Sequence, residues 1–195
     1  MKVEARLGDK GLYITDCIDQ EHLKHLSDVR DILPKKEDMH FYVSVLNRAV
    51  DKDLSEYLDT IFRNAILEYL NESQKDINDY IASLAYRINS WKTGITLYEH
   101  RDSTQYNDLK QSAGPRPSIN VLAYLTDDYK DGEIFFSEVG VSIRPKAGSV
   151  VIFDSDLMHG VNAVTSGDRR TLSSNLYSIH SEDIEEFKAK GYRVL

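Results

Sequence analysis

A histidine and an aspartate stand two positions apart in the stretch TLYEHRDSTQYN, residues 96–107. His100 and Asp102 follow an alternating run that is typical of a β-strand, in which side chains i and i+2 point to the same face. The chain would therefore present an imidazole and a carboxylate in the same direction. The pair alone is weak evidence, because an H-x-D sequence often arises by chance and a surface salt bridge explains it equally well.

A second segment, residues 144–170, favours a functional reading of the first. Pro145 and Gly148 open an apolar strand, a short acidic loop follows, and His159 leads into GVNAVTSGDRR. Core packing does not require a histidine just past a buried strand, followed by Arg169 ten residues later. The two segments together indicate a site that carries chemistry.

The combined motifs resemble those of the iron(II) and 2-oxoglutarate dependent dioxygenases, in particular the prolyl 4-hydroxylase-like branch. The similar region runs from Trp91 to about Tyr177, and residues 1–90 match only as helices that could buttress a sheet. As a set the motifs are specific, whereas none is specific alone. They are the H-x-D motif at His100 and Asp102, a Tyr-Leu strand end at Tyr124 and Leu125, Gly132-Glu133-Ile134, a P-x-x-G-S-x-x-x-F strand from Pro145 to Phe153, His159, and Gly167-Asp168-Arg169.

The resemblance implies that His100, Asp102 and His159 hold iron(II) and carry the catalysis. Two neutral imidazoles and one carboxylate form the facial triad of non-heme iron(II) oxygenases, which leaves three coordination positions open. The cosubstrates 2-oxoglutarate and O2 would take those positions, with ascorbate as an optional further cofactor. The protein would supply geometry and a dry environment.

The resemblance also implies that Arg169 binds the far carboxylate of 2-oxoglutarate, with Tyr124 as a hydroxyl donor. Arginine suits this role because its guanidinium stays charged when buried and meets a carboxylate in a two-pronged contact. Arg170 would point to the other face of a strand, and the family's register favours Arg169. The chain departs from the family pattern at three positions near the cofactor end or the substrate rim: Trp91, Asp131 and Asn175.

The chain must supply a sheet to position these residues. From about residue 83, seven short apolar or alternating runs broken by Gly, Asp and Pro predict an antiparallel sandwich or small barrel. Before it, apolar stripes at helical spacing predict helices over 16–33 and 53–73, with a candidate strand at 40–48. With the resemblance, we expect an α+β, mainly β fold: a double-stranded β-helix (jelly-roll) core with N-terminal helices packed against the major sheet.

The length of 195 residues fits one domain, 1–195, of the 2-oxoglutarate/iron(II) dioxygenase type. Within it we expect a helical support region at 1–82, the jelly-roll core at 83–180 and a C-terminal helix and tail at 181–195.

Residues 103–118 are polar, contain one glycine and two prolines, and begin directly after Asp102. We expect them to form a lid over the substrate, because a reactive centre must be shielded from water. Tyr106 and Arg116 are the expected substrate contacts in this lid.

The composition of the chain limits the classes of partner and the cellular location that we expect. The chain carries 32 acidic and 24 basic residues, for a formal charge of −8, and no Lys/Arg-rich stripe, so nucleic acid is not expected. No apolar run reaches the roughly 18 residues that a membrane span needs. The start lacks the apolar stretch of a signal peptide, and Cys17 as the single cysteine excludes an intrachain disulfide. We therefore expect a cytoplasmic protein whose oligomeric state the sequence leaves open.

The leading functional hypothesis is hydroxylation of a C–H bond, foremost on a prolyl residue of a peptide or protein, with decarboxylation of 2-oxoglutarate to succinate. One alternative keeps the chemistry and takes a free amino acid or small metabolite as substrate. Another is a non-catalytic, cupin-like binding barrel. A cupin would have a second histidine at the position of Asp102. A halogenase would have no carboxylate there, so that halide could bind the metal. The aspartate therefore disfavours both the cupin and the halogenase alternatives.

Overall fold

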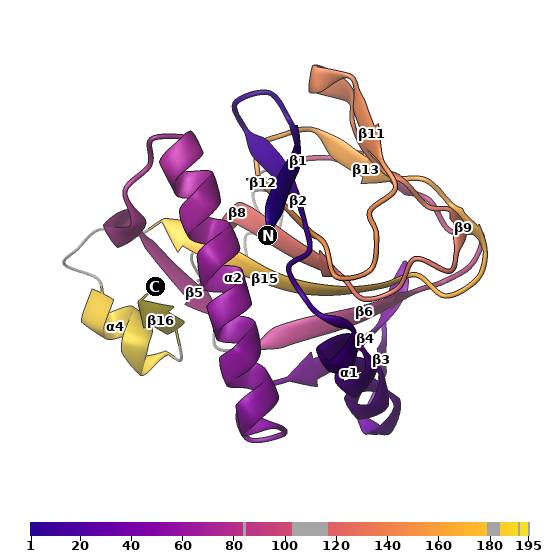
Figure 1. The fold of residues 1–195 in the computed structure, drawn as a ribbon, viewed down its shortest axis with the longest axis horizontal. Coiled ribbons are helices and arrows are strands. Elements are labelled where there is room, and N and C mark those ends of the chain that lie inside the picture. Colours follow the sequence, from indigo (N-terminus) through magenta and orange to yellow (C-terminus); the bar gives the residue numbers. More distant parts are fainter. Residues whose placement is uncertain (84, 103–116, 179–183, 191, 195) are drawn as a thin grey trace.

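Two antiparallel sheets form the core of the computed structural model, which describes residues 1–83, 85–102, 117–178, 184–190 and 192–194 (Figure 1). The major sheet has ten strands and the minor sheet has four, and a short two-stranded sheet joins β9 and β14. The central order of the major sheet is β1-β2-β12-β8-β15-β6-β4-β3, and that of the minor sheet is β11-β10-β13-β7. This arrangement is the expected jelly-roll core, and its sheets do not close into a barrel.

The strands and helices have the following bounds. The major sheet contains β1 (Lys2–Arg6), β2 (Gly11–Thr15), β3 (Lys36–Glu37), β4 (Phe41–Leu46), β5 (Tyr80–Ser83), β6 (Tyr86–Trp91), β8 (Pro117–Tyr124), β12 (Val150–Asp154), β15 (Arg170–Ser178) and β16 (Tyr192–Val194). The two smaller sheets contain β7 (Leu97–His100), β10 (Ile134–Phe136), β11 (Val141–Ile143) and β13 (His159–Val161), and β9 (Lys130–Asp131) and β14 (Val164–Ser166). The helices are α1 (Gln20–Ile32), α2 (Lys52–Glu72) and α4 (Ile184–Ala189), with 3-10 turns η1 (Ile77–Asp79) and η2 (Ser137–Val139).

The two faces of the major sheet have different partners. On β8, the alternate residues Ile119, Val121 and Ala123 are buried in the core that the sheet shares with α1 and α2. Leu122 and Tyr124, of opposite parity, belong to the second core, which the sheet shares with the minor sheet. A site between the sheets is therefore lined by the second set of β8 positions.

Helix α2 runs across the outer face of the major sheet (Figure 1). The side chain of Asp51 caps its start by accepting a hydrogen bond from the Leu54 backbone N–H at 2.9 Å. Its apolar stripe is buried, and the fully buried Phe62 meets the ring of Tyr86 on β6 edge-on, with centroids 5.1 Å apart. This packing confirms the expected buttress. Among the described helices, none has the length and apolar character to cross a bilayer.

The expectation of a helical region at 1–82 was wrong in part. Helices α1 and α2 lie where predicted, and β4 confirms the strand between them, but β1 and β2 form a hairpin that extends the major sheet. Strand β2 pairs with β12, which lies more than a hundred residues later in the chain. A local sequence pattern therefore cannot predict this pairing. At the other end of the chain, the tail also returns to the sheet, because β16 pairs with β5.

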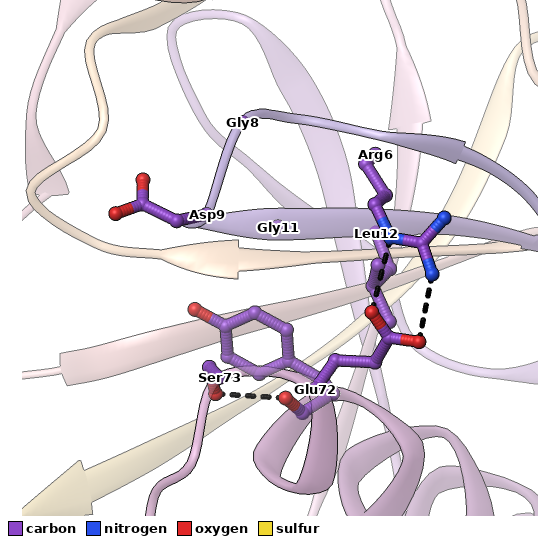
Figure 2. A pocket seen from close by; sticks show the side chains of 8 residues that line it. Arg6, Gly8, Asp9, Gly11, Leu12, Glu72 and Ser73 are labelled. Carbon is purple, nitrogen blue, oxygen red and sulfur yellow. Dashed lines mark hydrogen bonds and ion pairs between the residues drawn. The ribbon is translucent and has the colours of Figure 1, made fainter.

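A small hollow of about 40 Å³ lies between the β1–β2 hairpin and the end of α2 (Figure 2). Arg6 crosses its rim and donates hydrogen bonds to both carboxylate oxygens of Glu72, at 3.0 and 2.8 Å. Its volume suits a few water molecules, far below the several hundred Å³ of ligand pockets. None of its lining residues belongs to the predicted site.

Candidate metal and cosubstrate site

The structure brings His100, Asp102 and His159 together between the sheets. His100 ends β7 and His159 begins β13, and the two residues are direct partners in the minor sheet. One ligand atom from each of the three residues lies within 4.8 Å of the others. The Nε2 atom of His100 is 3.3 Å from Asp102 Oδ1, and that of His159 is 3.7 Å from Asp102 Oδ2.

Backbone carbonyls fix the orientation of both imidazoles. His100 Nδ1 lies 2.8 Å from the carbonyl oxygen of Tyr98, and His159 Nδ1 lies 2.9 Å from that of Leu157. Since a carbonyl oxygen only accepts, each Nδ1 must carry the hydrogen and donate it. In the neutral rings both Nε2 lone pairs then face Asp102, as in metal sites where a second contact sets the histidine tautomer.

The charges of the three groups suit a divalent cation. Burial holds the pKa of His159 below its usual value. Burial acts in the same direction on His100, but the protonated ring can donate to both Asp102 and the Tyr98 carbonyl, and these hydrogen bonds outweigh burial and raise the pKa. Burial opposes ionisation of Asp102, yet its hydrogen bond with His100 and the nearby histidine charges lower its pKa, so the carboxylate is ionised at neutral pH.

Aromatic side chains and a glycine shape the surroundings of His159. The Phe153 ring packs edge-on against the imidazole, with centroids 4.7 Å apart, and Phe136 lies 6.2 Å away. Gly160 lets β13 approach its neighbours, because a Cβ there would lie 2.8 Å from the Leu97 carbonyl oxygen. The ligands are therefore backed by a tightly packed apolar wall.

Arg169 is buried in the same core, with 1% of its surface exposed. Its Nη2 donates to the Tyr124 hydroxyl at 3.1 Å, and its guanidinium carbon lies 4.3 Å from the centre of the Trp91 ring. Within the described residues, its Nε and Nη1 have no hydrogen-bond partner. A buried guanidinium with two unpaired nitrogens is costly and is the arrangement expected for an anion site. Burial also raises the pKa of Tyr124, which keeps the proton on its hydroxyl.

Arg170 points to the opposite face of the sheet. It donates to the Ser27 hydroxyl of α1 at 2.9 Å and forms an ion pair with Asp168. The two neighbouring arginines thus have different surroundings, and only Arg169 shares the inner core with Tyr124.

Strand β8 connects the triad to Arg169. The Asn120 amide lies 2.7 Å from Asp102 Oδ2, and Tyr124 contacts Arg169. These two β8 residues are four positions apart on one face, so their Cα atoms are separated by about 13 Å. The half-buried Leu122 lies between them. A short dicarboxylate anchored at Arg169 could therefore reach a metal held by the triad.

Sequence reasoning missed Asn120. Its only signal is the alternation of SINVLAY, which puts it on the face of Tyr124. Trp91, noted only as a departure from the family pattern, covers the guanidinium of Arg169.

The other departures also have a structural setting. Asp131 adopts a φ of 56° and Gly132 one of 70°, and a Cβ on Gly132 would lie 3.2 Å from the Arg169 side chain. The glycine thus permits the close approach to Arg169, and aspartate is among the non-glycine residues that tolerate positive φ. Asn175 pairs with Asn120 across β15 and β8.

The lid prediction cannot be placed in the same way. Residues 103–116, including Tyr106 and Arg116, lie outside the described residues. Pro117 and Ser118, which we assigned to the same loop, begin β8.

Comparison with known proteins agrees with this geometry. Residues 85–177 match the family model of the 2OG-Fe(II) oxygenase superfamily. A viral collagen prolyl hydroxylase from Paramecium Bursaria Chlorella virus-1 has the same fold, with a TM-score of 0.68 and 16% identity over 89% of this chain and 98% of the viral chain. A Pseudomonas putida prolyl-4-hydroxylase aligns with a TM-score of 0.60 and 15% identity, over 88% of this chain and 94% of that one.

Curated relatives are similar over a shorter stretch. Human prolyl 3-hydroxylase 2 is 42% identical over 57 residues, which are 26% of this chain and 8% of the human protein. Mouse prolyl 3-hydroxylase 3 is 42% identical over 59 residues, 27% of this chain and 8% of that protein. The chain therefore matches less than a tenth of the length of these relatives.

The family match over residues 85–177, on a jelly roll that carries the His-x-Asp and distal His residues, supports a 2OG-Fe(II) oxygenase. Among such enzymes, the chain is prolyl hydroxylase-like. Enzymes of the 2OG-Fe(II) oxygenase superfamily are 2-oxoglutarate-dependent dioxygenases that use iron(II), 2-oxoglutarate and O2. The donor set of the triad and the unpaired nitrogens of Arg169 fit the metal and the dicarboxylate that such enzymes need.

Proposed function

We propose that this chain hydroxylates a prolyl residue of a peptide or protein and converts 2-oxoglutarate to succinate and CO2. One oxygen atom of O2 would enter the substrate C–H bond and the other would enter succinate. The observation that carries the proposal is the buried Arg169, whose Nε and Nη1 have no partner among the described residues and which lies on the triad side of the major sheet.

Each residue of the site has a distinct part. His100, His159 and Asp102 would hold iron(II) through two Nε2 atoms and a carboxylate oxygen. Arg169 would bind the far carboxylate of 2-oxoglutarate in a charge-assisted contact, and the protonated Tyr124 hydroxyl would donate to the same group. When bound, the metal and its cosubstrates supply the oxidation that no amino-acid side chain can perform.

A prolyl substrate is supported by the kind of protein that the chain resembles. The two solved structures described above are prolyl hydroxylases by name, and so are the curated relatives. The ring carbon that is hydroxylated stays open, because the names include both 3- and 4-hydroxylases. The alternative of a free amino acid or small metabolite keeps the same site and differs only in what approaches it.

The decisive experiment measures oxygen-dependent succinate formation with iron(II) and 2-oxoglutarate, on proline-containing peptides and on free amino acids. We expect a mass increase of one oxygen atom on a peptide, and loss of turnover and of iron binding in Asp102→Ala and His159→Ala. His22→Ala is the matched control, because this histidine lies on α1 and contacts Asp19.

Full activity in Asp102→Ala would contradict the assignment of the site. Turnover confined to free amino acids would instead retain the site and reject the peptide substrate. Metal binding with no turnover of 2-oxoglutarate under any condition would favour the non-catalytic barrel.

A further inference from the structure

We propose that Asn120 is a positioning residue for the metal: its amide holds one oxygen of Asp102 and leaves the other oxygen free to bind. The inference rests on the proposed function, because it requires Asp102 to be a metal ligand. Asn120 itself would touch neither the metal nor the cosubstrate.

The contact is short and lies in a buried setting. Asn120 Nδ2 is 2.7 Å from Asp102 Oδ2, and Asn120 has only 3% of its surface exposed. The other carboxylate oxygen, Oδ1, is 3.3 Å from His100 Nε2. The nearest neighbour of Oδ2 is therefore the Asn120 amide, with His159 Nε2 farther away at 3.7 Å, whereas the neighbour of Oδ1 is the imidazole of His100.

The direction of this hydrogen bond follows from the charge of Asp102. A carboxylate that binds a metal is deprotonated, so it can only accept hydrogen bonds. The side of the Asn120 amide that faces it must then be the NH2 group. A bond from an amide to a charged oxygen is stronger than one between neutral groups, and it opposes rotation of the carboxylate.

The position of Asn120 makes it a rigid support. Both histidines belong to the minor sheet, whereas Asn120 lies in the middle of β8 in the major sheet. Its backbone is held on both sides, because it pairs with Phe153 on β12 and with Asn175 on β15. Asp102 comes just after the end of β7, so the amide ties this ligand to the opposite sheet.

A carboxylate held in this way presents one oxygen to the metal in a fixed direction. Partners that orient metal ligands typically change metal affinity by about 10–100-fold when removed. We therefore expect a weaker metal site without the Asn120 amide, even though all three ligands remain. The coordination geometry should also change, because the released carboxylate could bind through both oxygens.

The test is anaerobic titration of the purified protein with iron(II), and with cobalt(II) as a spectroscopic probe, in the absence of substrate. Asn120→Ala should raise the Kd about 10–100-fold and alter the visible bands of the cobalt(II) protein. Asn120→Leu removes the donor while filling the space, and should give the same result if the alanine variant folds poorly. The matched control is Asn175→Ala, which removes the same amide from the paired position on β15 and should leave the Kd within about twofold.

The outcomes separate this inference from the proposed function. If the wild-type protein binds neither iron(II) nor cobalt(II), both the proposed function and the positioning role of Asn120 are wrong. A wild-type protein that binds metal, with unchanged Kd and cobalt(II) bands in a folded Asn120 variant, would overturn the positioning role alone. Equal weakening in Asn175→Ala would also overturn it, since the effect would then come from general loosening of the β8–β15 pair.

Discussion

Arg169 and Arg170 are neighbours in the sequence, yet one is buried beside Tyr124 and the other reaches Ser27 on the helix side of the sheet. In the described part of the chain, two buried nitrogens of Arg169, Nε and Nη1, have no partner, whereas Arg170 has one, its Nε. Only those of Arg169 lie on the side of the sheet where a dicarboxylate could bind between the sheets. Arg170 already has its counter-charge in Asp168. A shift of one residue in register would exchange these roles.

We predict that Arg169→Ala lowers the affinity for 2-oxoglutarate by more than about 100-fold, since breaking a buried ion pair costs about 3–5 kcal/mol. Arg170→Ala, the control, should change the affinity by less than about threefold because its contacts lie at the surface of the opposite face. Anaerobic titration of the manganese(II)-loaded proteins with 2-oxoglutarate measures both values. The reverse ranking would show that the arginine at 170 is the anchor.

The sequence carried enough information to predict that His100, Asp102 and His159 lie together, because the H-x-D pair has the parity of one strand face and the resemblance to the family added His159. These three residues do converge in the structure. Asn120 was out of reach, because its contact with Asp102 depends on how β8 faces the end of β7. An asparagine in a strand is otherwise an ordinary polar residue.

At the scale of elements, α2 supports the sheet that carries both Asn120 and the anchor for the dicarboxylate. The side chain of Asp51 satisfies the Leu54 N–H at the start of this helix. We predict that Asp51→Ala lowers the free energy of unfolding by about 1 kcal/mol, the usual cost of losing such a cap. Urea denaturation monitored by circular dichroism measures the change.

Asp53→Ala is the control for this prediction. Asp53 is exposed in the first turn of the same helix, so its removal costs only the interaction with the helix dipole, which salt screens. At high salt we expect this cost to fall below about 0.3 kcal/mol. A loss in Asp53→Ala as large as that in Asp51→Ala would mean that negative charge near the helix start, and not the cap, stabilises α2.

The predicted elements were most accurate where a segment is long or strongly patterned. All seven apolar or alternating runs after residue 83 contain a strand of the jelly roll, and both N-terminal helices were found. The hairpin of β1 and β2 and the short strands β3, β5, β9, β13, β14 and β16 were not predicted. Strands of two to five residues are defined by their partners, and the partners that place β2, β5, β9, β13 and β14 in their sheets are distant in the sequence.

At the scale of the whole molecule, the site is divided between the two sheets. The histidines belong to the minor sheet, whereas Tyr124 and Trp91 belong to the major sheet. A metal and a dicarboxylate bound together would bridge the sheets. Ligands that bind only the folded state stabilise it by mass action.

We predict that manganese(II) and 2-oxoglutarate, each at about 100 times its Kd, raise the melting temperature of the wild-type protein by about 10–20 °C under anaerobic conditions, because each ligand contributes about 2.7 kcal/mol and a domain of this size gains about 2–4 °C per kcal/mol. Differential scanning calorimetry measures the shift. In Asp102→Ala the shift should largely disappear, because 2-oxoglutarate would lose the metal as well. An equal shift in that variant would place the binding of these ligands outside the triad.

Strand β8 has a consequence for which diacid the enzyme can accept. With metal and cosubstrate bound as proposed, the interval from Asn120 to Tyr124 would set the distance between the metal end and the anchor end of the cosubstrate. The pleat of the backbone allows this distance to change only in steps of two residues, about 7 Å, because only such a step returns a side chain to the same face. Adding or removing one methylene changes the length of the diacid by much less than this step of about 7 Å. Discrimination among 2-oxo diacids by length would then depend on the spacing of main-chain positions along β8, together with the length of the Arg169 side chain.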